Sequence, residues 1–523
     1  MSYKRIVVGY IVILSLLFFC ILRVSSIALT PKYLESANEM TSRRIVLTNC
    51  RGTIYDSKQN KLTNNIEKYV LVITENPKAI NTISEYFTGE ETVEIINEIR
   101  NNKFAIRITD KPISCEGIDC LPFNVRTSDD SIAKHIIGYL DEENSGVSGL
   151  ELAFNDILYT NNQISLTINI DGQGGVLLGS AKLNNNLSTN GVVTTIDSDI
   201  QKIVEEAANE LTCGAVVVVD ISNGEIKAIA SRPDFNPEKL GKYISDENAP
   251  LINRALLNYN VGSVFKPCVA AAAIEAGYNY FVYKCNGVTD IDGLLFHCHN
   301  LSGHGQISLA EAIKHSCNTY FYNYAINLGA NKIFSMAEKA GFNSSISLTE
   351  GLSTSKGNLG DLETIEKSKR AIANLAIGQG ELMLSPVAIT NLYCAIANNG
   401  VYYPPTIYKG KIINNKFVDN EEKSIPVRLM SESTAMQLKN HLKGVLDEDG
   451  TGYLANPKII TAAGKTATAQ TGIIKDGSYV TNTWFCGFFP FENPKYVVSV
   501  LAENTETSCA GVFAEIANKM YSQ

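Results

Sequence analysis

The hydrophobic pattern of the chain begins with an apolar run from Ile6 to Leu22, in which only three residues are not aliphatic, phenylalanine or cysteine. A helix of that length is at the short end of what spans the hydrocarbon core of a membrane. Lys4 and Arg5 precede the run, and by the positive-inside rule such a short basic flank stays in the cytoplasm. The pattern predicts a cytoplasmic tail over residues 1–5 and a transmembrane anchor over residues 6–24, with the rest of the chain extracellular or periplasmic.

A cleavable signal peptide is the alternative for this segment, because Ser26-Ile27-Ala28 resembles a small-x-small cleavage site. The apolar run is longer than the roughly 7–15 residues of a signal-peptide core. Arg23 also lies between the run and the site. We therefore favour an uncleaved, single-pass anchor.

Short runs rich in β-branched residues follow the anchor, such as residues 44–47 and 69–73, and polar gaps separate them. Runs of this kind between polar segments are typical of strands. An asparagine-rich stretch at residues 184–186 has the composition of a linker. We expect a strand-rich, irregular module over residues 25–190.

Sharper signals begin near residue 191. Asp197 or Ser198 can cap a helix whose apolar positions recur at helical spacing as far as Leu211. Two strand pairs and a closing helix are also predicted, at residues 214–219 with 225–230, 484–489 with 496–501, and 512–521. Strands at both ends with helices between them predict an α+β domain over residues 191–523, built on one antiparallel sheet.

Composition narrows the class of protein. The 523 residues carry 45 Lys+Arg against 54 Asp+Glu, a net charge of −9, with 45% hydrophobic residues. The acidic balance argues against a nucleic-acid binder, which needs a cationic surface. Ordinary glycine and proline contents exclude a collagen-like or disordered chain.

The 12 cysteines are scattered, and two pairs are close enough in sequence to bridge, Cys115 with Cys120 and Cys285 with Cys298. Burial as small apolar side chains is the alternative for the rest. Cys285, the segment His297-Cys298-His299 and His304 offer ligands for zinc, but no CxxC or HxxxH spacing supports a site. We expect no metal and no cofactor.

The pattern Ser-x-x-Lys occurs three times, at Ser131, Ser263 and Ser353. Only the copy at Ser263 opens an alanine-rich segment that ends at Gly277, as a buried helix with a C-terminal glycine does. Serine and lysine three residues apart share one face of a helix, so a neutral lysine can take the proton of the serine. Ser263 is the candidate nucleophile and Lys266 its base.

Two further elements follow in order. Ser316-Cys317-Asn318 lies between a capping-box pattern at Ser308–Glu311 and a helix predicted over residues 319–328, where it can present a hydroxyl and an amide to a cleft. Taken alone, such residues are more often helix caps. Residues 464–469 predict a strand that carries Lys465-Thr466, and a lysine there could equally protect a sheet edge.

The order Ser-x-x-Lys, Ser-x-Asn, Lys-Thr-x resembles the active-site set of the penicillin-recognising serine acyltransferases. The chain as a whole resembles a class B penicillin-binding protein, a membrane-anchored peptidoglycan D,D-transpeptidase. Other strings similar to the family are Arg51–Asp56, Gly149–Glu151, Thr195–Asp197 with Gln201, Ser231–Pro233, Asn253–Ala255, Ile377–Gly380 and Gly487–Pro490. The resemblance implies a five-stranded antiparallel sheet with helices on both faces, preceded by a pedestal domain.

The resemblance also implies roles for the motif residues. Ser263 would attack the carbonyl of the penultimate D-Ala of a stem peptide, with Lys266 as base, kept partly neutral by burial and by Lys465. Ser316 and Asn318 would pass the proton to the departing D-Ala and orient the substrate amide.

On the strand, Lys465 and Thr466 would hold the terminal carboxylate, and the backbone N–H groups of Ser263 and Thr468 would form the oxyanion hole. An amine from a neighbouring stem peptide would resolve the acyl-enzyme into a crosslink. A β-lactam would mimic the D-Ala-D-Ala terminus and stay attached to Ser263.

Two positions depart from the family pattern. Ala467 stands where the family usually has glycine after Lys-Thr, and its methyl group could crowd the Ser263 helix or narrow the substrate groove. Val261 replaces a proline common before Gly-Ser, which bears on loop stiffness. Both changes keep the reacting groups, so we expect an active enzyme.

Alternative functions remain at this stage. A class A type β-lactamase needs a carboxylate to activate water, and no Glu-x-x-Leu-Asn string lies between Asn318 and Lys465. A D,D-carboxypeptidase, a β-lactam-sensing homologue and a catalytically silent scaffold share the motifs. The resemblance implies a partner, a polytopic glycan polymerase of the kind that serves cell shape, elongation, division or sporulation, because a class B enzyme does not polymerise glycan.

Overall fold

The computed structural model describes residues 3–29, 41–185, 187–475, 477–504 and 507–522. The chain forms two compact units: Met1–Arg51, Asn65–Arg126 and Thr160–Leu187 make the first, and Gly52–Asn64, Thr127–Tyr159 and Ser188–Gln523 the second. Two segments that precede residue 190 therefore pack with the C-terminal part. One reason is backbone pairing, because strand β2 (Thr53–Tyr55) pairs in parallel with β8 (Gly191–Thr194).

The N-terminal apolar run forms helix α1 (Tyr3–Leu29), which extends beyond the predicted anchor at both ends. It is long and apolar enough to cross a membrane, and none of its described residues is buried. Apolar side chains that no protein core covers need another apolar medium. The helix fits a single-pass membrane anchor.

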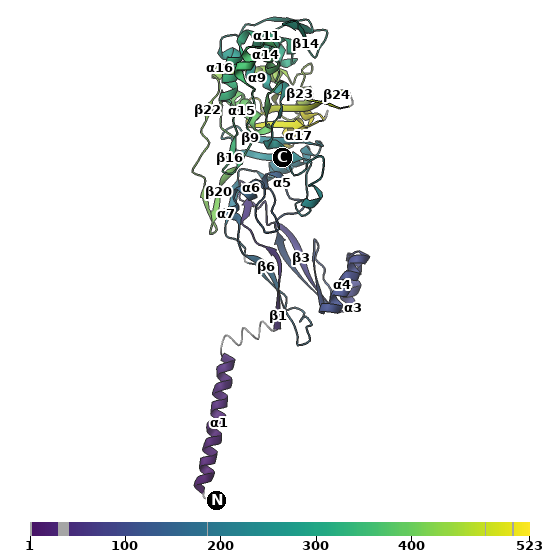
Figure 1. The fold of residues 1–523 in the computed structure, drawn as a ribbon, viewed down its shortest axis with the longest axis vertical. Helices are drawn as coiled ribbons and strands as arrows, with labels where there is room; N and C mark the ends of the chain where they lie inside the picture. Colours follow the sequence, from purple (N-terminus) through teal and green to yellow (C-terminus); the bar gives the residue numbers. More distant parts are fainter. Residues whose placement is uncertain (1–2, 30–40, 186, 476, 505–506, 523) are drawn as a thin grey trace. The chain divides into compact units, whose positions relative to one another are not determined.

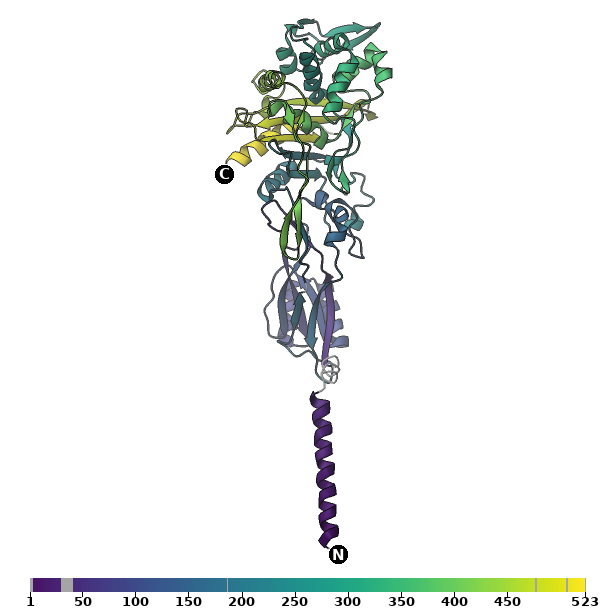
Figure 2. The ribbon, with the colours of Figure 1, turned by 90° about the vertical axis from the view of Figure 1, so that its left-hand side faces the viewer.

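The first unit contains two three-stranded sheets, shown as long purple and blue arrows in Figure 2. Their strand orders are β1-β6-β7 (Ser42–Asn49, Gln163–Asn169, Lys182–Asn185) and β4-β3-β5 (Phe104–Thr109, Ile66–Thr74, Ile118–Val125). The strand-rich prediction is confirmed. Sequence patterns had not predicted the two helices between β3 and β4, α3 (Pro77–Tyr86) and α4 (Gly89–Asn102), although Thr88 and Glu91 form a capping box at α4.

A five-stranded antiparallel sheet is the centre of the second unit, as predicted. Its order β10-β9-β25-β24-β23 joins the two ends of the domain, with β9 and β25 paired directly although they are far apart in sequence. Figure 1 shows yellow β23 and β24 in one layer with teal β9. The strands are β9 (Gly214–Asp220), β10 (Ile226–Arg232), β23 (Ala463–Lys475), β24 (Ser478–Phe489) and β25 (Tyr496–Ala502).

Helices cover both faces of this sheet. Helices α8 (Ser198–Ala208) and α17 (Cys509–Tyr521) contact each other and one face, and α15 (Pro386–Ala397) and α16 (Glu432–Gly444) contact strands of the sheet as well. The alternation of strand side chains separates the faces. In β24, Phe485 packs at a tilt and Phe489 edge-on against Phe513 of α17. Trp484 points the other way and donates its Nε1 hydrogen to the Asn260 carbonyl.

Smaller elements complete the second unit. The four-stranded sheet β2-β8-β20-β21 adds β20 (Tyr408–Ile413) and β21 (Lys416–Asp419). The helices on the active-site side are α9 (Lys266–Glu275), α10 (Leu309–Lys314), α11 (Asn318–Leu328), α12 (Ala330–Lys339), α13 (Leu362–Glu366) and α14 (Lys369–Ala376). Between α9 and α10 lie two paired sets of short strands, β12 (Tyr283–Cys285) with β15 (Gly305–Ile307), and β13 (Val288–Ile291) with β14 (Leu294–His297).

The remaining short elements connect these parts. They are α5 (Lys134–Ile137), α6 (Gly149–Ala153), α7 (Asn155–Leu158), β11 (Tyr259–Asn260) paired with β18 (Met383–Leu384), β16 (Ser347–Thr349) with β17 (Leu352–Ser353), and β19 (Val401–Tyr402) with β22 (Val427–Arg428).

Candidate active site

The candidate nucleophile lies in a short turn of 3-10 helix, Gly262–Phe265, that runs directly into α9. Pro267 occupies the first turn of α9, where its missing N–H group costs nothing. Side chains three residues apart eclipse in a 3-10 helix. The side chain of Ser263 therefore leaves the backbone on the same side as that of Lys266. The serine lies in the 3-10 turn before α9 and not within the α-helix itself.

Hydrogen bonds to two other segments hold this turn. Gly262 has φ +61°, a conformation that glycine adopts without strain, and its N–H group donates to the Gly378 carbonyl at 2.9 Å. The hydroxyl of Tyr393, on α15, donates to the Val264 carbonyl at 3.1 Å. Val261, at the position of the family's proline, is fully buried. The turn is thus fixed by packing and hydrogen bonds instead of by proline.

Lys266 joins the first motif to the second. Its Nζ donates to the Ser316 carbonyl at 2.8 Å, to Asn318 Oδ1 at 2.7 Å and to Ser316 Oγ at 3.2 Å. Burial of the ammonium group lowers the pKa of Lys266 from 10.5 to about 7. A substantial fraction of neutral amine is therefore available near neutral pH.

The second motif forms the junction of two helices. As predicted, Ser308 caps α10 by accepting a hydrogen bond from the Glu311 N–H. Cys317 is the N-cap residue of α11, which begins at Asn318, one residue earlier than predicted. Ser316 has φ +51°, unusual for a residue other than glycine, so its backbone conformation depends on its neighbours.

The third motif lies on β23 and has two distinct faces. Lys465, Ala467 and Ala469 are buried, whereas Thr466 and Thr468 alternate with them on the more exposed face. Lys465 donates to the Thr466 carbonyl at 3.1 Å. Burial, and secondly the charge of Lys266, keeps the pKa of Lys465 well below its usual value.

The methyl group of Ala467 points away from the exposed face, toward the turn that carries Ser263. A Cβ atom placed on Gly262 would lie 3.1 Å from Ala469 Cβ, 3.2 Å from the Thr468 carbonyl oxygen and 3.3 Å from Ala467 Cβ. Because Gly262 has no Cβ, the two alanine methyl groups fit against it. Of the two effects considered from sequence, close packing against the turn is the one observed.

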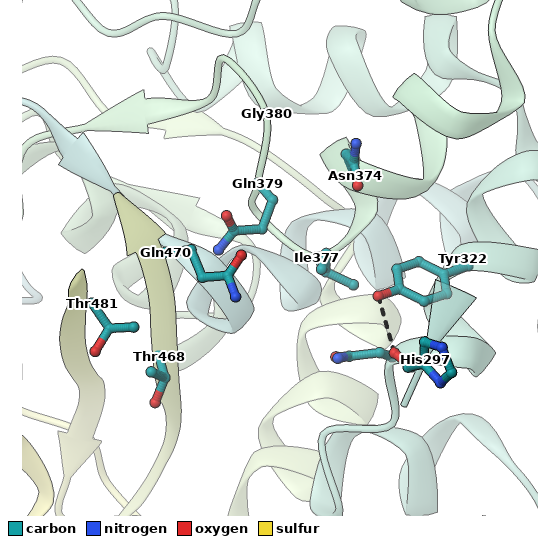
Figure 3. Close-up of a pocket in the computed structure, with 10 residues that line it drawn as sticks. His297, Tyr322, Asn374, Ile377, Gln379, Gly380, Thr468, Gln470 and Thr481 are labelled. Carbon is teal, nitrogen blue, oxygen red and sulfur yellow. Dashed lines mark hydrogen bonds between the residues drawn. The ribbon is translucent and has the colours of Figure 1, made fainter. Parts of the chain in front are cut away.

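A cavity of about 510 Å³ adjoins these motifs. Figure 3 shows its wall, with Thr468 and Gln470 on one strand and the Tyr322 hydroxyl bonded to the His297 carbonyl at 3.4 Å. The lining residues are His297, Asn318, Tyr322, Asn374, Ile377, Gln379, Gly380, Thr468, Gln470 and Thr481. The cavity is the place where a substrate can reach the second and third motifs together.

Several of these lining residues were not singled out from sequence. Tyr322 follows Asn318 by four residues on α11, so helical spacing puts both on one side. Gln470 follows Thr468 by two residues, which is the spacing of one strand face. Sequence had raised His297 only as a possible zinc ligand and gave no signal for Thr481, and both reach the cavity from segments outside the three motifs.

The other two Ser-x-x-Lys copies are engaged elsewhere. Lys134 pairs with Asp234 at 2.6 Å and donates to the Asp129 carbonyl, while Ser131 accepts a hydrogen bond from Ser128. Ser353 lies in strand β17. Among the described residues, the Ser263 copy is the one that meets the Ser-x-Asn segment.

The two cysteine pairs suggested by spacing are not bridged, since Cys115, Cys120, Cys285 and Cys298 are all free thiols in the structure. Cys285 and Cys298 nevertheless converge, together with His304 and Cys317. Sequence spacing had weighed the first three of these four residues as zinc ligands and had not selected Cys317.

A family model described as the penicillin binding protein transpeptidase domain matches residues 214–522. Among curated proteins, the chain is 29% identical over 394 residues to the stage V sporulation protein D of Bacillus subtilis, covering 72% of this chain and 59% of that protein. It is 25% identical over 392 residues to the peptidoglycan D,D-transpeptidase FtsI of Buchnera aphidicola, covering 72% and 64%. The chain thus spans about three fifths of the length of these relatives.

Among solved structures, a D,D-transpeptidase domain of a peptidoglycan glycosyltransferase from Eggerthella lenta superimposes with a TM-score of 0.66. The sequences are 23% identical, and the match covers 91% of this chain and 98% of that one. This likeness supports the fold described above.

Proposed function

Because the chain belongs to the penicillin-binding protein transpeptidase family, we propose that it is a membrane-anchored, serine-type peptidoglycan D,D-transpeptidase of class B. The observation that carries the proposal is the buried amine of Lys266, bonded to both polar residues of the Ser-x-Asn motif. This contact assembles two motifs that are about fifty residues apart, and the cavity beside them is lined by Asn318 and by Thr468 of the third.

The first step is acylation of Ser263. Its Oγ attacks the carbonyl of the penultimate D-Ala while neutral Lys266 takes the hydroxyl proton, and an Oγ–C bond forms. The C–N bond to the terminal D-Ala then breaks. The departing amine receives a proton through Ser316, whose hydroxyl lies 3.2 Å from Lys266 Nζ.

The remaining motif residues bind and orient the substrate. The N–H group of Ser263, together with that of Thr468, stabilises the oxyanion of the tetrahedral intermediate. Thr466 holds the terminal carboxylate from the more exposed face of β23, Lys465 lies behind it on the buried face near Lys266, and Asn318 orients the substrate amide. The side chain of Ala467 does not contact the substrate, because its methyl group faces Gly262.

The acceptor in the second step is an amine of a neighbouring stem peptide, which makes a crosslink and frees Ser263. The name of the Buchnera relative, a peptidoglycan D,D-transpeptidase, supports this choice over hydrolysis by water. A β-lactam enters the same first step and remains as a stable acyl-enzyme. Helix α1 keeps its basic end in the cytoplasm and the catalytic unit outside, where a polytopic glycan polymerase supplies the strands.

The test is covalent labelling by a fluorescent penicillin of the full chain in detergent, followed by denaturing electrophoresis. We expect a band with the wild type and none with Ser263→Ala. Ser353→Ala, which removes the serine of another Ser-x-x-Lys copy, is the matched control and should label like the wild type.

Turnover of a D-Ala thioester in the presence of a D-amino acid then separates the activities. Amide product above hydrolysis identifies a transpeptidase, whereas hydrolysis alone identifies a carboxypeptidase. A folded wild-type chain that forms no acyl-enzyme with either reagent would be a scaffold, and the proposal would be wrong.

A further inference from the structure

Four potential metal ligands converge directly behind the Ser-x-Asn motif. They are Cys285 at the end of β12, Cys298 after β14, His304 before β15, and Cys317 at the N-cap of α11. Their ligand atoms all lie within 4.8 Å of one another. Three separate segments therefore bring three thiol groups and one imidazole, the side chains that zinc prefers, close together.

Three of the six distances between these ligand atoms are close to those of a tetrahedron around zinc. Cys285 Sγ lies 3.5 Å and Cys298 Sγ 3.7 Å from His304 Nδ1, and Cys298 Sγ lies 3.9 Å from Cys317 Sγ. With Zn–S bonds of about 2.3 Å and Zn–N bonds of about 2.0–2.1 Å, the edges of a regular tetrahedron are about 3.5–3.8 Å. These three pairs are already at the right spacing, and no ligand atom has to move far, because the remaining pairs lie within 4.8 Å.

We propose that Cys285, Cys298, His304 and Cys317 bind one structural Zn²⁺ ion that holds the Ser-x-Asn segment in place. Three thiolates and one imidazole make a closed, four-coordinate set with no open position, which is typical of structural zinc. This proposal departs from the expectation of no metal, which was drawn from the lack of CxxC or HxxxH spacing.

The surroundings of the cluster suit thiolate ligands. The three cysteines are almost fully buried, and His304, the fourth, is partly exposed and gives a path for the ion. The hydroxyl of Thr319 donates to Cys285 Sγ at 3.1 Å. Outer hydrogen bonds of this kind orient metal ligands.

The backbone around the ligands is fixed independently of any ion. Cys285 on β12 pairs with Gly305 on β15. Because His304 directly precedes Gly305, this pairing brings His304 close to Cys285. The N–H group of Cys298 donates to the Gly287 carbonyl at 2.8 Å, and that of Cys317 to the Ala312 carbonyl at 2.9 Å. Preformed loops lower the cost of assembling the site.

The position of Cys317 links the ion to the active site. Cys317 lies between Ser316 and Asn318, the two residues that accept hydrogen bonds from Lys266. A metal bond at Cys317 would restrain the unusual backbone of Ser316, φ +51°, and the first residue of α11. Cys317 is thus a positioning residue, and this second half of the inference rests on the proposed function.

The alternative to a zinc site is a disulfide bond between Cys298 and Cys317. The two sulfur atoms are 3.9 Å apart, whereas a disulfide bond is about 2.05 Å long. A disulfide would use two of the four ligands and leave Cys285 and His304 aside. Thiol counting on protein denatured with a chelator and without reductant therefore discriminates between the two.

The first experiment measures zinc by plasma mass spectrometry in the full chain, purified in detergent without chelator. We expect about one zinc per chain. His304→Ala should lower zinc affinity at least about tenfold, and Cys298→Ser should abolish stoichiometric binding. Cys213→Ser is the matched control, because its sulfur lies against Asn248 and outside the four-atom group, and it should retain the ion.

The second experiment replaces zinc with Co²⁺, which reports tetrahedral thiolate coordination by its visible absorption. After removal of the metal by a chelator, the rate of penicillin labelling should fall, and Zn²⁺ but not Mg²⁺ should restore it. Cys213→Ser should show the same loss and recovery as the wild type.

Metal content and labelling are separate readouts. Stoichiometric zinc in a chain that is never acylated would leave the metal site standing and refute the enzyme. The zinc inference is wrong if the folded wild type binds no more zinc or cobalt than Cys298→Ser, or if peptide mapping of the unreduced protein finds Cys298 bonded to Cys317. A full labelling rate after zinc removal would overturn the positioning role.

Discussion

At the scale of single residues, Lys266 shows how burial sets chemistry. A charged ammonium group loses its hydration in the interior, which favours the neutral amine. Three oxygen atoms of the Ser-x-Asn segment partly compensate by accepting its hydrogen bonds. The same contacts thus hold the amine proposed as the base, and its lowered pKa leaves it able to take a proton.

We predict that acylation by a penicillin speeds up as pH rises through about 7. The pKa of Lys266 is lowered to about 7, so the neutral form that accepts the Ser263 proton grows from a minority below this pH to a majority above it. The second-order rate constant of labelling, measured from about pH 6 to 8, checks this.

A thermal unfolding curve at each pH serves as the control for folding. A rate constant that is flat across the range in folded protein would contradict Lys266 as the titrating base.

At the scale of elements, β23 and the 3-10 turn fit together through small residues. Gly262 lacks the Cβ atom that would meet Ala467 and Ala469, so the strand can lie against the turn. The exposed face of the same strand carries Thr466 and Thr468. One strand therefore packs against the turn of the candidate nucleophile with one face and presents two threonines, the proposed substrate contacts, on the other.

We predict that Ala467→Gly leaves the labelling rate within about twofold of the wild type and lowers the free energy of unfolding by roughly 0.5–1 kcal/mol. The methyl group lies outside the substrate face, and glycine in a strand carries an entropic cost of that size. Labelling kinetics and chemical denaturation check the two parts.

Gly262→Ala is the opposing variant, because it adds a methyl group at the same contact and at a positive φ, and it should lose labelling. A large gain in labelling rate with Ala467→Gly would mean that the methyl group obstructs the groove after all.

At the scale of the whole molecule, the chain passes several times between the two compact units. Residues 52–64 and 127–159 belong to the catalytic unit although they precede its main segment. Helix α1 differs from the other helices described here, since it is strongly apolar and yet protein does not bury its side chains. The molecule combines an apolar anchor with two folded units.

We predict that the mature protein retains α1, with its N-terminus in the cytoplasm. In spheroplasts, added protease should remove a C-terminal tag while an N-terminal tag stays protected with the anchor. An intact mass that lacks the residues up to Ala28 would instead identify a cleaved signal peptide, and a protected C-terminal tag would reverse the orientation.

Local patterns in the sequence determined much of this protein. Helix caps at Asp197 and Ser308, the strand pairs of the sheet and the order of the three motifs all depend on residues within a few positions of one another. Such short-range signals need no knowledge of the fold. They located Ser263, Lys266 and the Ser-x-Asn segment.

Only the tertiary structure decided which distant segments meet. Cys317 joins Cys285, Cys298 and His304 because two pairs of short strands and two helices fold back on one point, a path that ligand spacing does not encode. His297 and Thr481 enter the cavity in the same way. The physical reason is that long-range packing sets these distances, and no period or motif along the chain records it.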